Sequence, residues 1–144
     1  MPEEVKVNYV DHISIAVKDL KKAEEDFKAT FGWEPAGRYQ DMDEKIRVVY
    51  FQVGPTAVEI MEDLDGTGEV AKFISKRGEG VMLVSFNVDH CEHALKQLQN
   101  NGAQVIDRKP RYARELNRYF AFIHPKVCHG ILTEVIDGKY ETHE

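Results

Sequence analysis

DHISIAV at residues 11–17 decides the fold, because LVSFNV at residues 83–88 is a near copy of its last six residues. The offset between the two copies is 88 − 17 = 71 residues. Both copies alternate apolar residues with small or polar ones, which is typical of a strand with one buried face. Asp19 and Asp89 follow the copies, and each is expected to cap a helix by accepting backbone N–H bonds. Such a repeat predicts two equivalent modules.

Each copy is followed by one helix and three extended stretches. Apolar residues three or four positions apart lie on one face of each expected helix, and the helices end at Gly32 and Gly102. Glu92 completes a capping-box pattern in the second. The extended stretches are expected at about 34–39, 46–53 and 57–61, and again at 104–107, 118–124 and 131–136. The chain is therefore predicted to be one α+β domain over residues 9–137, made of βαβββ modules at about 9–63 and 80–137 with a linker helix at 68–79.

Composition and charge narrow the class of protein. A chain of 144 residues fits one domain or two small modules that share a core. The net charge of −6 argues against nucleic acid or an anionic membrane as a partner, and no apolar run approaches the roughly 20 residues that a membrane span needs. The two cysteines form no disulfide framework, and the acidic N-terminus lacks the features of a signal peptide. We expect a cytoplasmic protein with a small-molecule partner.

One segment departs from the acidic balance. Five basic residues fall within eleven positions, namely Arg108, Lys109, Arg111, Arg114 and Arg118. A solvated loop is the plainer interpretation, and a clamp for a phosphate or carboxylate is the alternative.

Strand parity predicts which side chains face away from the helices. If Ile13 and Ile15 pack on a helix, then His12 and Ser14 point to the other face of the sheet. The same argument places Glu59 with His12, and Glu134 at the matching position of the second module, an offset of 134 − 59 = 75. A buried carboxylate needs a partner. Two glutamates and one histidine on a common face suggest a divalent metal site; a salt-bridged cluster around a protonated His12 is the alternative.

Four phrases of the sequence carry a family resemblance: DHISIAVKDLKKA, VEIMEDL, AKFISKRGEG and FIHPKVCHGILTEVI. From about Tyr9 to Asp137 the chain resembles the methylmalonyl-CoA epimerases of the glyoxalase, or vicinal oxygen chelate, superfamily. The resemblance implies two βαβββ modules whose sheets curl into a cupped, barrel-like mixed sheet around a ligand cleft. It also implies a homodimer, since members of the superfamily often dimerise.

The resemblance implies four metal ligands, and this chain supplies three of them. His12, Glu59 and Glu134 match, whereas Leu83 stands where the family has a histidine. The three remaining ligands suit a divalent ion such as Co²⁺, Mn²⁺, Fe²⁺, Ni²⁺ or Zn²⁺. The loss of an imidazole is expected to weaken the affinity for the ion.

The implied activity is epimerisation of an acyl-CoA thioester or related carboxylate by removal and return of an α-proton. Glu134 is the expected base, but the glutamate that some members carry on the third strand is Val48 here, which leaves a second base unidentified. Four residues are expected to contact substrate: Ser14, Leu83, Lys126 and His129. For His129 a place on a surface loop is the alternative.

The departures at Leu83 and Val48 leave other functions open. One is an epimerase or isomerase with an altered substrate. Another is a non-catalytic small-molecule-binding protein of the bleomycin-resistance type, and a third is a glyoxalase I-type lyase. The fold alone does not decide among them.

Overall fold

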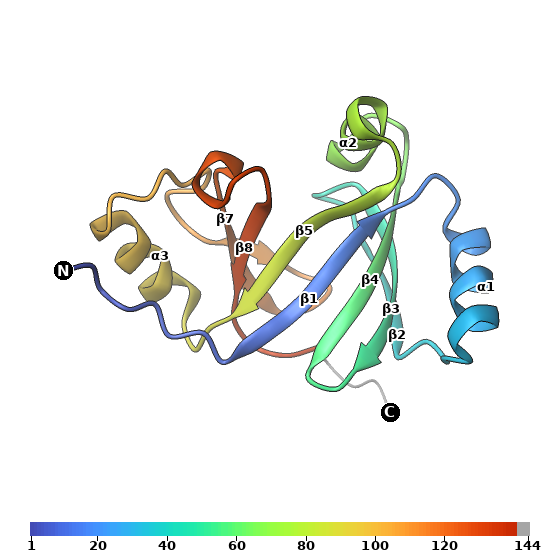
Figure 1. The fold of residues 1–144 in the computed structure, drawn as a ribbon, viewed down its shortest axis with the longest axis horizontal. Helices are drawn as coiled ribbons and strands as arrows, with labels where there is room; N and C mark the ends of the chain where they lie inside the picture. Colours follow the sequence, from blue (N-terminus) through green and yellow to red (C-terminus); the bar gives the residue numbers. More distant parts are fainter. Residues whose placement is uncertain (141–144) are drawn as a thin grey trace. The chain divides into compact units, whose positions relative to one another are not determined.

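The computed structural model describes residues 1–140, and these fall into two compact units. The first unit contains residues 12–82, and the second contains residues 1–11 together with the chain from Leu83 onward. The amino-terminal segment therefore belongs with the second half of the sequence. Each unit carries one of the expected helix-and-sheet modules (Figure 1).

The first unit contains four strands in the order β2-β3-β4-β1. Its elements are β1 (Tyr9–Ala16, of which the residues from His12 on belong to this unit), α1 (Leu20–Phe31), β2 (Gly37–Asp41), β3 (Ile46–Val53), β4 (Thr56–Asp63) and α2 (Glu69–Arg77). Strand β1 is parallel to β4, whereas β2 with β3 and β3 with β4 are antiparallel. The βαβββ pattern predicted from the sequence is confirmed in this half, with a following helix at α2.

Helix α1 covers one face of these strands (Figure 1). Its residues Leu20, Ala23 and Phe27 pack with Phe51 of β3 and Ile60 of β4. The helix begins at a capped end, because the Asp19 carboxylate accepts a hydrogen bond from the Lys22 N–H. It ends at a glycine in the left-handed conformation. The predicted first helix and its cap are confirmed.

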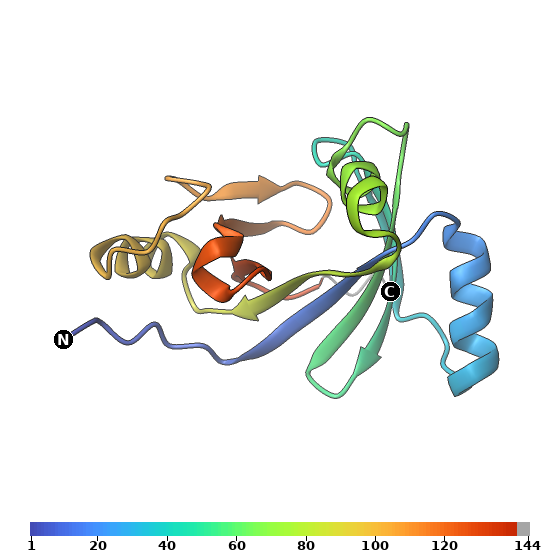
Figure 2. The same cartoon turned by 45° about the horizontal axis from the view of Figure 1, so that its top comes forward.

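The second unit contains four strands in the order β5-β8-β7-β6. Its elements are β5 (Gly80–Asn87, in this unit from Leu83), α3 (Cys91–Asn100), β6 (Arg111–Ala113), β7 (Arg118–Ile123), the 3-10 helix η1 (Pro125–Cys128) and β8 (Leu132–Ile136). Strand β5 is parallel to β8, and the other pairs are antiparallel. Strands β6 and β7 form the orange hairpin in Figure 2. The strand order repeats that of the first unit, since β5-β8-β7-β6 corresponds to β1-β4-β3-β2.

The core of the second unit lies between α3 and the sheet. It consists of Val88, Cys91, Ala94, Leu95, Ala121 and Val135. Val5 of the amino-terminal segment packs against it. Two hydrogen bonds join the same segment to the end of α3: the Glu3 N–H donates to Asn101 Oδ1, and Asn101 Nδ2 donates to the Glu3 carbonyl. The second unit thus needs residues from both ends of the described chain.

Two expectations for the second module are wrong. The stretch at 104–107 forms only an isolated bridge from Val105 to Ile123, and the strand is β6 instead. Asp89 does not cap α3, whose N-cap is His90 without a side-chain bond. The Asp89 carboxylate instead accepts a hydrogen bond from the Asn8 side chain. A long-range partner has therefore replaced the local capping bond.

Both helices α1 and α3 receive a carboxylate from the end of their module's last strand. Glu62 accepts the Leu20 N–H at 2.6 Å, and Asp137 accepts the Cys91 N–H at 2.9 Å. These pairs show the repeat again, since 91 − 20 = 71 and 137 − 62 = 75. A carboxylate at a helix N-terminus satisfies an orphan N–H and complements the helix dipole.

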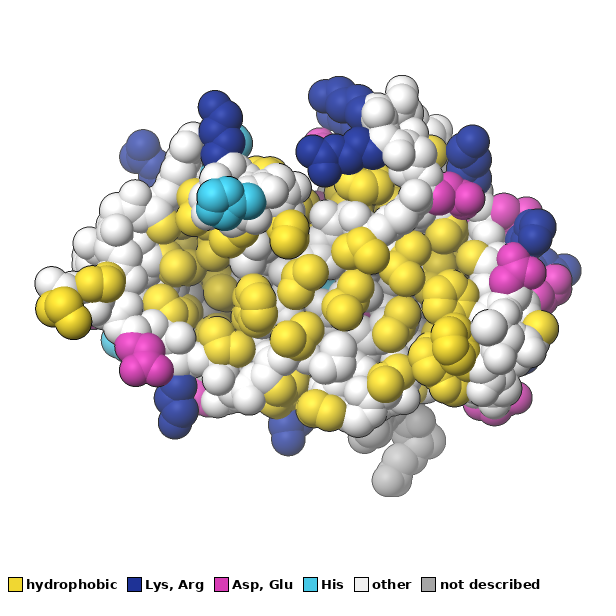
Figure 3. Space-filling model, in the orientation of Figure 1, with side chains coloured by type: hydrophobic (Ala, Val, Ile, Leu, Met, Phe, Trp, Pro, Cys, Tyr) yellow, Lys and Arg dark blue, Asp and Glu magenta, His cyan; other side chains and the backbone are white. Residues whose placement is uncertain are grey.

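Charged side chains gather at α2. Lys72, Lys76 and Arg77 project from this helix, where Figure 3 shows a group of basic side chains. Lys76 and Arg77 lie in its last turn, which is the favourable end of the helix dipole for a positive charge.

No helix within residues 1–140 is long and apolar enough to cross a membrane.

Candidate active site

The first unit places its polar side chains on the sheet face opposite α1. Ser14 is in register with Glu59 across the parallel β1–β4 pair, and Tyr50 is in register with Glu59 across β3–β4. Paired residues share a face of the sheet, and His12 lies two residues before Ser14 on that same face. The predicted co-facing of His12, Ser14 and Glu59 follows from this register.

Glu59 is the centre of this group. Its Oε1 accepts a hydrogen bond from Ser14 Oγ at 3.0 Å, and its Oε2 accepts one from Tyr39 Oη at 2.8 Å. His12 Nε2 lies 3.7 Å from Glu59 Oε1. The carboxylate is 2% exposed and His12 is 4% exposed. Hydroxyl donors on both oxygens compensate the burial of the carboxylate.

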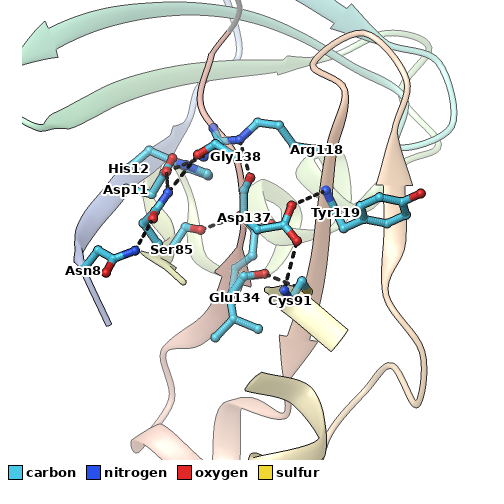
Figure 4. Close-up of polar contacts among 12 residues, drawn as sticks. Asn8, Asp11, His12, Ser85, Cys91, Arg118, Tyr119, Glu134, Asp137 and Gly138 are labelled. Carbon is cyan, nitrogen blue, oxygen red and sulfur yellow. Dashed lines mark hydrogen bonds and ion pairs between the residues drawn. The ribbon is translucent and has the colours of Figure 1, made fainter. Parts of the chain in front are cut away.

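The second unit repeats the arrangement around Glu134. Ser85 is in register with Glu134 across β5–β8, and Ser85 Oγ donates a hydrogen bond to Glu134 Oε1 at 2.6 Å (Figure 4). Both residues are buried. Ser14–Glu59 and Ser85–Glu134 are thus equivalent pairs of the repeat. Strand parity predicts the serines on this face, but it does not predict their bonds to the glutamates.

Leu83 stands in the second unit where His12 stands in the first. It is 6% exposed and in register with Leu132, whereas His12 is in register with Ala57. The position is therefore apolar on both strands of the β5–β8 pair. An aliphatic side chain cannot ligate a metal, so the second unit offers Glu134 alone from the expected set.

The donor chemistry of His12 and Glu59 fits a divalent metal ion. An imidazole nitrogen and a carboxylate oxygen 3.7 Å apart, both buried, form two corners of a possible coordination sphere. Within residues 1–140, no three His, Cys, Asp or Glu side chains are grouped as a metal site. The pair by itself is a half-site that needs further ligands.

Two of the expected substrate contacts lie at η1 of the second unit. Lys126 is in η1 and His129 follows it, and both side chains are exposed. His129 adopts a left-handed backbone conformation with φ 58°. His124 has a structural role, because its Nδ1 accepts the Lys126 N–H and caps η1. Whether Lys126 and His129 contact substrate stays a prediction.

The basic segment contains a structural residue that the sequence did not reveal. Arg118 is fully buried and forms an ion pair with Asp11, while its Nε donates to the Asp137 carbonyl at 2.9 Å (Figure 4). Asn87 also donates to Asp11, at 2.8 Å. Arg111 lies at the surface and pairs with Asp107 at 2.8 Å. Arg118 is therefore a buried tie for the amino-terminal segment, and the interpretation of all five cations as one solvated loop or one clamp is wrong.

Comparison with known proteins places the chain in a family. Residues 11–122 match the family model of the Glyoxalase/Bleomycin resistance protein/Dioxygenase superfamily. The chain belongs to this superfamily. Within it the chain is similar to methylmalonyl-CoA epimerases, which confirms the resemblance found in the sequence.

Three relatives illustrate the similarity. An uncharacterized protein of Bacillus subtilis, YqjC, is 30% identical over 137 residues, which cover 95% of this chain and 97% of that protein. The human mitochondrial methylmalonyl-CoA epimerase is 27% identical over 135 residues, covering 88% of this chain and 72% of the relative. A solved methylmalonyl-CoA epimerase in complex with methylmalonyl-CoA and NH4+ is 27% identical, with a TM-score of 0.87 over 92% of this chain and 96% of that one. The chain is an epimerase-like member of the superfamily with its α+β fold.

Proposed function

We propose that the protein is a metal-dependent epimerase or isomerase that acts on an acyl-CoA thioester by α-proton abstraction. The observation that carries the proposal is the repeated pair of a buried glutamate and its serine, Ser14–Glu59 in one unit and Ser85–Glu134 in the other. Buried carboxylates on a sheet face are costly. Their recurrence at equivalent positions, in a chain similar to epimerases, supports a site that uses both.

The proposal assigns three metal ligands and one base. His12, Glu59 and Glu134 would hold the ion, and a bound divalent metal would supply Lewis-acid polarisation of the carbonyl oxygens of the substrate. Glu134 accepts the α-proton, and Ser85 holds its Oε1 by a 2.6 Å hydrogen bond. Ser14 and Tyr39 hold Glu59 in the same way. The ligands and the base remain proposals.

The substitutions at Leu83 and Val48 support an altered substrate. Both side chains are buried, at 6% and 1% exposed. A larger apolar share of the site would suit an acyl group with more hydrocarbon than a methyl substituent. The proposal includes a small-molecule acyl-CoA or carboxylate as substrate, a homodimer and a cytoplasmic location.

A second candidate function is a small-molecule-binding protein without catalysis, of the bleomycin-resistance type. Leu83 and Val48 favour it. In the family that the chain resembles, a metal-ligating histidine stands at the position of Leu83, and some members carry a glutamate that can move a proton at the position of Val48. The two candidates differ in one measurable property, which is whether the α-hydrogen of a bound thioester exchanges with solvent.

The decisive experiment measures that exchange. Methylmalonyl-CoA and ethylmalonyl-CoA are incubated in deuterated buffer with a divalent metal, and deuterium incorporation at the α-carbon is followed by mass spectrometry. The wild type should exchange the hydrogen, and Glu134→Gln should be slower by roughly 100-fold or more because a general base is lost. Glu92→Gln, an exposed change in the first turn of α3, is the matched control. Binding of either thioester without exchange would support the binding protein and refute the epimerase.

Metal binding is tested separately. His12→Ala should abolish uptake of Co²⁺ or Mn²⁺, whereas His93→Ala, at an exposed position of α3, should retain it. Stoichiometric uptake by His12→Ala would contradict the ligand assignment.

A further inference from the structure

We infer that Tyr39 is a positioning residue that fixes the Glu59 carboxylate for ligand binding in the first unit. The inference deepens the proposed function and rests on it for the role of Glu59. It assigns a function to strand β2, which carries none of the residues expected from the sequence.

The sheet register brings Tyr39 to the correct face. Tyr39 is in register with Val48 across β2–β3, and Tyr50 is in register with Glu59 across β3–β4. Val48 and Tyr50 are two residues apart on β3, so all four side chains lie on one face. Tyr39 Oη reaches Glu59 Oε2 at 2.8 Å and therefore crosses β3 diagonally, from the level of Val48 to that of Tyr50.

The neighbours of Tyr39 leave this path open. Val48 is short, so it does not fill the space above β3. The Tyr50 ring leans over Gly37, where an added Cβ would lie 2.4 Å from Tyr50 Oη. The rings of Tyr39 and Tyr50 are 6.4 Å apart at an angle of 55°. The absence of a side chain at Gly37 thus leaves room for the Tyr50 ring, while the Tyr39 side chain extends to Glu59.

The direction of the bonds defines what Tyr39 does. A tyrosine hydroxyl at 2.8 Å donates to a carboxylate that also accepts from Ser14 Oγ at 3.0 Å. One donor on each oxygen fixes the plane of the carboxylate, because rotation about the terminal bond would break both contacts. His12 Nε2 lies 3.7 Å from the oxygen that Ser14 holds. Tyr39 therefore fixes the orientation that the Glu59 carboxylate presents to His12.

The effect of such supporting hydrogen bonds on metal affinity is known to an order of magnitude. Removal of a partner of a metal ligand costs roughly 10- to 100-fold in metal affinity or activity. Because the Tyr39 hydroxyl contacts the carboxylate and not the reacting atoms, its removal should lower metal affinity and kcat while KM for the thioester changes little.

The test uses Tyr39→Phe, which keeps the ring and removes only the hydroxyl. Tyr112→Phe is the matched control, because Tyr112 is an exposed tyrosine of the second unit whose hydroxyl donates to Asn117. The dissociation constant of Co²⁺ alone is measured by calorimetry, together with the visible spectrum of the bound ion. Tyr39→Phe should weaken Co²⁺ binding by about 10-fold or more and shift the spectrum, and Tyr112→Phe should do neither.

Ser14→Ala gives a second route if Tyr39→Phe folds poorly. Since the two hydroxyls hold one carboxylate, the losses in Co²⁺ affinity from Tyr39→Phe and Ser14→Ala should be non-additive in the double variant. Co²⁺ affinity within about twofold of the wild type in Tyr39→Phe would overturn the inference.

The outcomes separate the inference from the proposed function. Tyr39-dependent Co²⁺ binding without α-hydrogen exchange on any thioester would support the positioning role and refute the epimerase. Exchange by a wild type that binds no Co²⁺ would overturn the inference and leave the epimerase standing without its metal.

Discussion

Loss of the Asp11 carboxylate should destabilise the protein more than loss of any exposed charge. Asp11 faces Arg118, whose side chain is fully buried at 0% exposed, and it also accepts the Asn87 amide at 2.8 Å. Asp11→Ala would leave a buried guanidinium with carbonyl acceptors at Asp137 and Gly138 and the ring of Tyr140, but without its counter-charge. Removing one member of a buried ion pair costs about 3–5 kcal/mol.

For a chain of this length each kcal/mol lowers Tm by about 2–4 °C. Asp11→Ala should therefore lower Tm by roughly 6–20 °C, which calorimetry can measure, while urea unfolding can measure the loss in free energy of unfolding. Arg38→Ala is the control, because Arg38 pairs with Glu24 while 58% exposed and should cost less than about 1 kcal/mol. The double variant Asp11→Leu with Arg118→Met should recover much of the loss, because it leaves no unpaired buried charge. A loss below about 1 kcal/mol for Asp11→Ala, or a double variant no more stable than the single one, would refute the reasoning.

Three further outcomes are expected. Leu83→His should tighten Co²⁺ binding, because a nitrogen donor would replace an apolar group of similar volume at the position equivalent to His12. An unchanged affinity in calorimetry would contradict the expectation that position 83 is the fourth ligand position. Burial raises the pKa of the Cys91 thiol to about 12, and the negative charge of Asp137 adds to this shift. At pH 8.5, iodoacetamide should therefore label the half-buried Cys128 and spare Cys91, which peptide mass spectrometry can measure. Gly37→Ala should destabilise the protein by about 1–3 kcal/mol, because its Cβ would meet Tyr50 Oη at 2.4 Å; an unchanged urea midpoint would show that Tyr50 moves without cost.

The sequence predicted the parts of the fold that follow from a local pattern. Alternation on β1 and β5 identified the two faces, and helical spacing identified α1 and α3. Because the register of a half-buried strand is fixed by its pattern, alternation alone is enough to place Glu59 and Glu134 on the face away from the helices. The match of the fold to solved epimerases extends that agreement to most of the chain.

The parts that failed depend on partners far along the chain. Asp89 fits the local rule for a cap, but Asn8 binds it from 81 residues away, and Asp137 supplies the bond to the helix instead. Arg118 sits among basic residues and resembles a surface cation, yet its partner Asp11 is 107 residues distant. No local pattern in the sequence marks Tyr39 as a partner of Glu59, since their contact depends on the register of the strands. Neither spacing nor composition encodes such pairings.

The tie between Arg118 and Asp11 has a consequence for synthesis on the ribosome. Asp11 is made 107 residues before Arg118, a delay of roughly 5–20 s at typical elongation rates. Residues 12–82 of the first unit are complete for only the last third of that interval, because 118 − 82 = 36 residues then remain, and residues 1–11 still have no second unit to join. The amino-terminal segment therefore cannot join its unit until the last strands of that unit have been made. A tag or chaperone bound to residues 1–11 should delay folding of the second unit and not of the first.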